Sequence, residues 1–155
     1  MIIEADNCRI RSWENRDVER LPIVANDMRV ARYLRHRFPH PYTSEDAARW
    51  LALVADSPDA THFAIEVDGT LAGAVGIERL TQEHVGVGDL GYWLGHAYWG
   101  RGIATSAVRA VVRYGFETLD LRRLEAPVMS GNLASARVLE KAGFVREATL
   151  SACYV

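Results

Sequence analysis

The fold is decided by the stretch Trp99-Gly100-Arg101-Gly102-Ile103-Ala104-Thr105. It lies between an apolar, strand-like run and a long, helix-like run. Its two glycines let the backbone approach a ligand closely, and a helix that begins near Gly102 presents unpaired N–H groups and the positive end of its dipole. The stretch therefore predicts a cradle for a phosphate group.

Two familiar phosphate-binding motifs do not fit this stretch. A nucleoside triphosphate loop needs Lys followed by Ser or Thr after the last glycine, where this chain has Ile103 and Ala104. A dinucleotide site needs a third glycine or alanine where Thr105 stands, and an acid at the end of the following strand, whereas Asp120 precedes that strand. Glycine motifs are weak evidence alone, so the surrounding residues must decide which phosphate compound binds.

Apolar periodicity and turn residues predict helices interleaved with a hairpin-rich sheet, which is a mixed α/β layer. Asp68-Gly69 supplies the positive φ angles of a tight hairpin, and Gly143 followed by Phe144 resembles a Schellman stop. Asp17 is expected to cap a helix that Pro22 displaces or kinks. The expected strands are 8–13, 62–67, 71–80, 90–94, 123–129 and 144–150, and the four expected helices are 17–25, one after Thr43 or Ser44, 103–119 and 132–142.

Composition predicts one ordinary globular domain over residues 1–155, with 49% apolar and 25% charged residues. The formal net charge of −2 lacks the basic excess of a nucleic-acid binder, so we expect no nucleic-acid partner. The sequence has neither an apolar run of about 18 residues nor a signal-like start, so we expect a cytoplasmic protein without membrane contact.

The cysteines and histidines predict no metal site. Cys8 and Cys153 fit neither a metal nor a disulfide spacing, and both are expected to be buried thiols. His36 and His40 are four positions apart, but the prolines beside His40 interrupt any helix there and no carboxylate completes a ligand set.

The block from Asp89 to Glu147 resembles the GNAT superfamily of acetyl-CoA-dependent N-acetyltransferases. The pyrophosphate signature of that superfamily, Gln/Arg-x-x-Gly-x-Gly/Ala, maps onto residues 99–104, with Trp99 in place of Gln or Arg. Residues 26–34 and 41–51 resemble the first two helices of the branch that acetylates the N-termini of ribosomal proteins, the RimJ/RimL type. Two further runs are similar to a segment of the same branch: Asn132-Leu133-Ala134-Ser135 and Leu139-Glu140-Lys141-Ala142-Gly143-Phe144.

The resemblance implies a mainly antiparallel sheet that splays open between its fourth strand, residues 90–94, and its fifth, residues 123–129. Acetyl-CoA, the co-substrate, would enter this gap and rest its pyrophosphate on residues 99–105. Its pantetheine amides would pair with the strand edge at Trp93, Leu94 and Gly95, as an added strand pairs with a sheet edge. Asn132 would hydrogen-bond the pantetheine or acyl region, although it is also a good helix N-cap.

Attack of an amine on a thioester needs a base, because most amines are protonated at neutral pH. The resemblance places the base at Asp89, which is one methylene shorter than the usual glutamate and so favours a water relay; a solvated charge is the alternative. Glu78 is a second candidate base, and the sequence leaves the choice open. The resemblance implies that Ser135 protonates the leaving thiolate, although Ser135 also fits an ordinary first-turn serine.

The expected acceptor is a primary amine: a protein N-terminus, an amino acid or a small amine. In the superfamily, the connection between the first two helices walls the acceptor cleft, which implies roles for Phe38 and Tyr42. Tyr92 is either a core residue or a lining residue of the acceptor pocket. The alternative function is a catalytically degenerate module that binds acetyl-CoA or another protein.

The C-terminus departs from the family pattern. Relatives continue after the strand at 144–150 with a turn and a last strand, whereas this sequence stops at Val155. Either the sequence is cut short, or the final strand is missing, or a neighbouring chain supplies it. Because an exposed sheet edge favours association, we expect a homodimer, with strand exchange as one route.

Overall fold

The computed structural model describes residues 1–56 and 61–151. Within these residues, six strands form one sheet in the order β1-β2-β3-β4-β5-β6, antiparallel throughout except for the parallel pair of β5 and β6. The strands are β1 (Ile2–Glu4), β2 (Arg9–Arg11), β3 (His62–Val67), β4 (Thr70–Arg79), β5 (Val87–Leu94) and β6 (Arg123–Glu125). The helices are α1 (Asp17–Ala25), α2 (Met28–Ala31), α3 (Ser44–Ala55), α4 (Ile103–Glu117) and α5 (Leu133–Lys141), with short 3₁₀ turns η1 (Gln82–His84) and η2 (His96–Tyr98).

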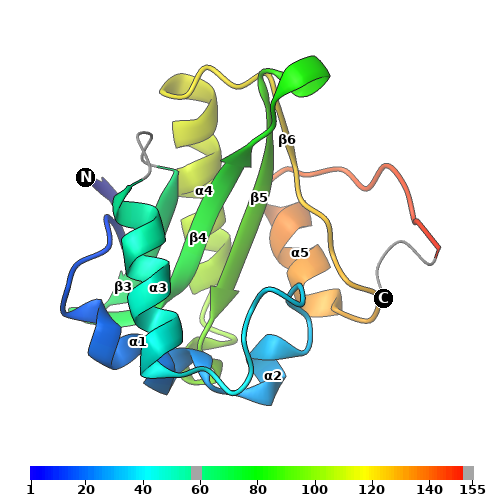
Figure 1. The fold of residues 1–155 in the computed structure, drawn as a ribbon. Helices are drawn as coiled ribbons and strands as arrows, with labels where there is room; N and C mark the ends of the chain where they lie inside the picture. Colours follow the sequence, from blue (N-terminus) through cyan, green and yellow to red (C-terminus); the bar gives the residue numbers. More distant parts are fainter. Residues whose placement is uncertain (57–60, 152–155) are drawn as a thin grey trace.

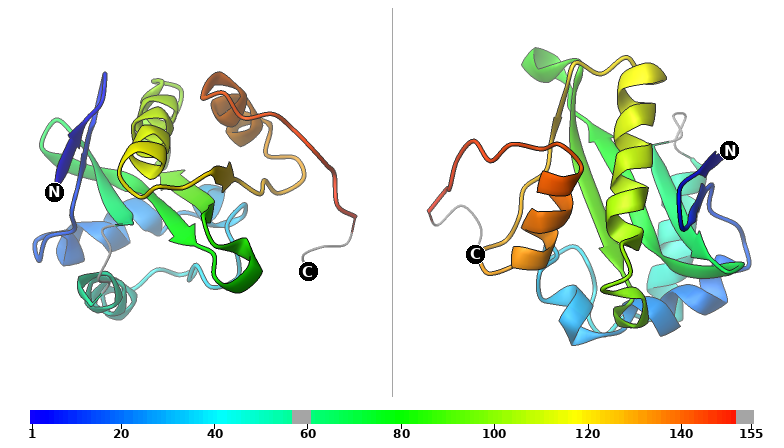
Figure 2. Two further views of the ribbon diagram at one scale, coloured as in Figure 1. Left: turned by 90° about the horizontal axis from the view of Figure 1, so that it is seen from above. Right: turned by 180° about the vertical axis from the view of Figure 1, so that it is seen from behind.

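The sheet is covered on both faces. Helices α4 and α5 lie on one face, and α1 and α3 lie on the other (Figures 1 and 2). The larger core lies under α4, where Val108 and Val111 pack among Val75, Ile77 and Leu90 of the sheet. A smaller core joins α1 and α3 to the opposite face. Its buried residues are Leu21, Ala25, Tyr42, Ala47, Ala64 and Leu71.

The turn and cap residues of the central elements confirm the sequence predictions. Asp68 and Gly69, with φ of 50° and 74°, join β3 to β4 in a hairpin. Thr43 caps α3 in a reciprocal capping box with Asp46. Each of these elements therefore begins or turns where a local side-chain pattern predicts it.

The predicted Schellman stop of α5 is also confirmed. Gly143 adopts a φ of 96°, and its N–H donates to the carbonyl of Glu140 at 3.0 Å. The N–H of Phe144 donates to the carbonyl of Leu139 at 3.0 Å, which closes the second bond of the motif.

One strand prediction is too long and another is wrong. The strand expected at 123–129 ends at Glu125, because Pro127 lacks the N–H that a sheet ladder requires. The strand expected at 144–150 does not form in the described chain, where these residues lie extended and mostly exposed beyond α5. A segment without a neighbouring strand has no ladder partner, and this explains the difference. Strand β5 also begins earlier than expected, at Val87.

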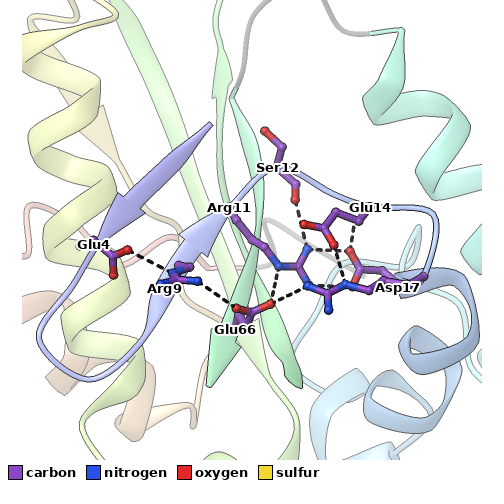
Figure 3. Close-up of polar contacts among 8 residues, drawn as sticks. Glu4, Arg9, Arg11, Ser12, Glu14, Asp17 and Glu66 are labelled. Carbon is purple, nitrogen blue, oxygen red and sulfur yellow. Dashed lines mark hydrogen bonds and ion pairs between the residues drawn. The ribbon is translucent and has the colours of Figure 1, made fainter. Parts of the chain in front are cut away.

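The predicted N-cap role of Asp17 is wrong as well. Arg16 holds the cap position, while the Asp17 carboxylate is buried and accepts two hydrogen bonds of 2.8 Å from the Arg11 guanidinium. Arg11 Nε also donates to Glu66 at 2.7 Å (Figure 3). We call Arg11, Asp17 and Glu66 the buried ion cluster; it ties β2, α1 and β3 together. Pro22 lies inside α1 without displacing its start.

Cys8 is buried as predicted, and burial raises the pKa of its thiol to about 11. Cys153 lies outside the described residues. None of the helices in residues 1–56 and 61–151 is long and apolar enough to cross a membrane. The expected homodimer stays a prediction.

Candidate functional site

Strands β5 and β6 part soon after they meet. Their parallel pairing covers only Val87–Asp89 against Arg123–Glu125. Beyond Asp89, β4 is the one strand in the described chain that pairs with Leu90–Leu94, while α5 lies across from the open edge (Figure 1). The predicted splay of the sheet therefore exists, and it exposes a strand edge to which a ligand can add.

The predicted phosphate cradle lies at the start of α4. Gly102 is the N-cap residue, with φ of 73° and ψ of 3°, a left-handed conformation that favours glycine. The first helical hydrogen bond of α4 runs from Ser106 N to Gly102 O at 3.1 Å. The N–H groups of residues 103–105 therefore donate to no carbonyl within the helix. Gly100 has φ of 70°, and a Cβ built there meets nothing within 4 Å. In residues 1–56 and 61–151, no hydrogen bond uses the N–H groups of residues 103–105. These amides and the open space beside Gly100 suit a pyrophosphate.

The turn between β1 and β2 braces the cradle. Asn7 Nδ2 donates to the carbonyl of Arg101 at 3.0 Å, and Asp6 N donates to Ser106 Oγ at 3.0 Å. Both bonds tie the loop and the first turn of α4 to this turn, and neither uses an N–H group of residues 103–105. Sequence reasoning missed these two residues, since no local pattern links a residue to one about a hundred positions away.

Trp99, the departure from the superfamily signature, ties the cradle to the sheet. Its indole Nε1 donates to the carbonyl of Leu94 at 2.8 Å, and its ring lies 4.8 Å from that of His96. The Leu94 carbonyl retains a second lone pair, so this bond does not block the predicted pairing of a ligand with Trp93, Leu94 and Gly95. Trp99 lacks the polar side chain of the Gln or Arg in the superfamily signature, but its indole forms a hydrogen bond that links β5 to the loop.

Ser135 and Tyr92 meet at the mouth of the splay on the α5 side. Their hydroxyl oxygens are 2.6 Å apart, and Tyr92 Oη also donates to the Ser135 carbonyl at 3.1 Å. Burial raises the pKa of Tyr92, so its hydroxyl stays protonated at neutral pH. Asn132 caps α5 by accepting from Ser135 N at 3.3 Å. The residue pair predicted at the thiol end of the cofactor is thus held in place by Tyr92, which lies on the face opposite Phe38 and Trp93.

The two candidate bases are neighbours. Glu78 on β4 lies directly opposite Asp89 on β5. Arg37 Nη2 donates to Glu78 at 2.8 Å, which lowers the pKa of that carboxyl, and Arg35 Nη2 lies 3.5 Å from Asp89 Oδ2. Sequence reasoning found both carboxylates but missed their ion pairs with the two arginines.

The α2–α3 connection, residues 32–43, covers the face of β4 and β5 that carries Glu78 and Asp89. Phe38 packs against Trp93 with ring centroids 5.4 Å apart, and against Tyr42 at 5.3 Å. Tyr42 is buried, which raises its pKa to about 12, and it supports Phe38 from the core side. A pocket of about 660 Å³ opens between α2 and the connection, lined in part by Met28, Arg32, Arg35, His36, Phe38 and His40.

No group of three or more His, Cys, Asp or Glu side chains in residues 1–56 and 61–151 is placed to hold a metal ion. The site offers carboxylates at Glu78 and Asp89, hydroxyls at Tyr92 and Ser135, and backbone amides at the start of α4. Such groups bind an anion and move protons.

The family comparison agrees with this geometry. Residues 7–145 match the acetyltransferase (GNAT) domain. The chain belongs to the GNAT acetyltransferase family. The chain is also similar to a "Putative ribosomal N-acetyltransferase YdaF" of Bacillus subtilis, with 31% identity over 92% of this chain and 80% of that protein. This relative supports the RimJ/RimL-type branch.

Two further similarities bear on this GNAT chain. A "Probable N-acetyltransferase YjcK" of Bacillus subtilis is 47% identical over 56% of this chain, and the match spans 49%, about half, of that protein. The solved structure "Mycobacterium smegmatis RimJ in complex with CoA-disulfide" superposes with a TM-score of 0.88 over 99% of this chain and 80% of its own, at 22% identity, which supports the fold. The domain and its named relatives identify the chain as an N-acetyltransferase.

Proposed function

We propose that this protein transfers an acetyl group from acetyl-CoA to a primary amine by direct attack of the amine on the thioester. The observation that carries the proposal is the splay after Asp89. It leaves Asp89 on the face covered by the α2–α3 connection and the Ser135–Tyr92 pair on the α5 face of the same strand. An acyl group lying in that gap would have a proton acceptor on one side and a proton donor on the other.

The residues present fit acetyl-CoA. The open space at Gly100, the left-handed Gly102 and the unpaired amides before Ser106 suit a pyrophosphate, and the free edge at Leu90–Leu94 suits the pantetheine amides. Arg101, whose guanidinium carbon lies 5.9 Å from the centre of the Tyr98 ring, adds positive charge beside the cradle. Bound there, acetyl-CoA would supply an activated acetyl thioester.

The chain's own residues supply the proton transfers. Asp89 accepts a proton from the acceptor ammonium, directly or through water, which frees the nitrogen lone pair. A carbon–nitrogen bond forms as the carbon–sulfur bond breaks, and Ser135 gives its proton to the departing thiolate. Tyr92, in hydrogen-bond contact with Ser135, returns a proton to it and recovers its own from water. The nitrogen, now bonded to the acetyl carbon, gives its second proton to the hydroxide left by that water, and Asp89 releases its proton to solvent. An ammonium and acetyl-CoA thus give the acetylated amine, the free thiol of coenzyme A and one proton.

The test is release of free thiol from acetyl-CoA with a panel of peptides, amino acids and polyamines. We expect acceptor-dependent release for at least one class of amine. Tight acetyl-CoA binding without release for any acceptor would contradict the proposal and favour a binding module.

Replacing Asp89 by asparagine should lower kcat by roughly 10²- to 10⁴-fold, because the amide cannot accept the proton. The affinity for acetyl-CoA should stay within about 3-fold of the wild type, since Asp89 lies near the start of β5 whereas the cradle follows the end of that strand. Steady-state kinetics and calorimetry measure the two effects. Glu78→Gln is the matched control, and a larger loss of kcat in that variant would assign the base to Glu78.

Replacing Ser135 by alanine should lower kcat by roughly 10²-fold, because the thiolate loses its proton donor. Tyr92→Phe should give a smaller loss, since it removes the partner of Ser135 but not the donor itself. Ser44→Ala, at the exposed start of α3, serves as the control. Full turnover in Ser135→Ala would show that the hydroxyl only packs against Tyr92.

A further inference from the structure

Two arginines of the α2–α3 connection pair with the two candidate bases. Arg35 forms an ion pair with Asp89 at 3.5 Å, and Arg37 forms one with Glu78 at 2.8 Å. The side chains of Arg35 and Arg37 are 39% and 69% exposed, so both ion pairs face solvent and can be exchanged. Such pairs are worth only about 1 kcal/mol or less, and a ligand can replace them.

The two carboxylates need positive charge beside them. Glu78 and Asp89 are direct cross-strand neighbours, and like charges in that position destabilise a sheet. The arginines relieve this repulsion. Arg35 and Arg37 stand two positions apart on one connection, so a ligand that displaces both side chains and still neutralises both carboxylates brings two positive charges of its own.

Space for such a ligand lies next to Asp89. Gly91 shares a face of β5 with Asp89 and Trp93, because side chains alternate along a strand. Gly91 is exposed, and a Cβ built there meets nothing within 4 Å. Phe38 contacts Trp93 on the far side of this opening. The free surface is therefore bounded by a carboxylate at one end and aromatic rings at the other, which suits an alkyl ammonium.

We propose that Arg35 and Arg37 are specificity-determining residues that stand in for the acceptor, and that the acceptor is an amine with a second positive charge close to the reacting one. The reacting ammonium takes the place of Arg35 on Asp89, and the second cation takes the place of Arg37 on Glu78. A small diamine and a peptide whose N-terminal residue is followed by lysine share this chemistry. The inference rests on the proposed function, since it assigns the acceptor of that site.

The first experiment compares matched acceptors in wild-type protein. We expect kcat/KM for 1,3-diaminopropane to exceed that for propylamine by at least about 10-fold after allowance for its two amines. The peptide amides Ser-Lys-Gly-Gly and Ser-Gln-Gly-Gly form the second pair and distinguish a peptide acceptor from a small diamine. Equal kcat/KM within both pairs would overturn the inference while leaving the proposed function intact.

The second experiment uses variants of both sides of the ion pairs. Arg35→Gln and Arg37→Gln should each lower KM for the preferred dication by about 3-fold, because the acceptor no longer competes with the arginine. Glu78→Gln should remove the preference for the dication, so that kcat/KM for 1,3-diaminopropane falls to the value for propylamine in the same variant. Arg113→Gln, exposed on α4 on the opposite face of the sheet, is the matched control. A higher KM in the Arg35 and Arg37 variants would show that these residues bind the acceptor, and would overturn the inference.

Calorimetry provides a readout that does not depend on turnover. Titration of 1,3-diaminopropane into the coenzyme A complex should give a lower Kd for Arg35→Gln and a higher Kd for Glu78→Gln. Absence of thiol release with every amine would contradict the proposed function alone. A Kd for 1,3-diaminopropane that is the same in the wild type, Arg35→Gln and Glu78→Gln would contradict the inference alone.

Discussion

Gly102→Asp is expected to weaken acetyl-CoA binding by at least about 100-fold. The new carboxylate would stand at the N-terminus of α4, beside the amides that the proposed pyrophosphate uses. Two unit charges about 4 Å apart near a protein surface interact by about 4 kcal/mol, and about 1.4 kcal/mol corresponds to each tenfold change in affinity. Calorimetric titration with acetyl-CoA and with coenzyme A measures the loss.

Gly102→Asn separates charge from backbone strain. Asparagine has nearly the shape of aspartate and is among the residues that best tolerate the left-handed conformation, with φ of 73° at this position. We expect the asparagine variant to keep its affinity within about 10-fold of the wild type, because the strain is shared but the repulsion is absent. Normal binding by Gly102→Asp would show that the pyrophosphate does not lie at the start of α4.

Local conformations of the site could be predicted because a few neighbouring residues determine them. The start of α4 next to Gly102, the hairpin turn at Asp68-Gly69 and the stop at Gly143 each follow from the backbone freedom of glycine or a short polar residue. The N-cap at Asn132 follows from its side-chain oxygen. Such features need no knowledge of the rest of the chain.

Contacts between distant segments could not be predicted in the same way. Arg35 meets Asp89 across 54 positions, and Asn7 meets Arg101 across 94. No periodicity or spacing encodes these pairs, because they depend on how the α2–α3 connection and the β1–β2 turn pack on the sheet. The neighbouring placement of Glu78 and Asp89 is an intermediate case, since it follows from the antiparallel register of β4 and β5 once both strands are known.

Asp17 shows how a local signal can mislead. An aspartate before a helix is a good N-cap by composition, but here a buried guanidinium competes for its carboxylate. Arg11 offers a planar fork that fits both oxygens, and these charge-assisted bonds are stronger than a single backbone cap. The competing partner becomes visible only when β2 and α1 are placed side by side.

Arg11→Ala is expected to lower the free energy of unfolding by about 3–5 kcal/mol. The substitution leaves Asp17 and Glu66 buried without their shared cation, and an uncompensated buried charge is strongly destabilising. The hydrogen bond to Asp17 raises the pKa of Arg11, so the guanidinium stays charged across the range in which the protein is studied. Urea unfolding followed by circular dichroism measures the change.

Arg9→Ala is the matched control for the buried ion cluster. Arg9 also contacts Glu66, at 3.8 Å, but its side chain is 49% exposed, so its loss should cost about 1 kcal/mol or less. In a double-mutant cycle, Arg11→Ala combined with Asp17→Ala should cost less than the sum of the two single changes, because the second substitution removes a charge that the first left unpaired. Additive losses, or a loss for Arg11→Ala no larger than that for Arg9→Ala, would mean that the cluster does not hold α1 on the sheet.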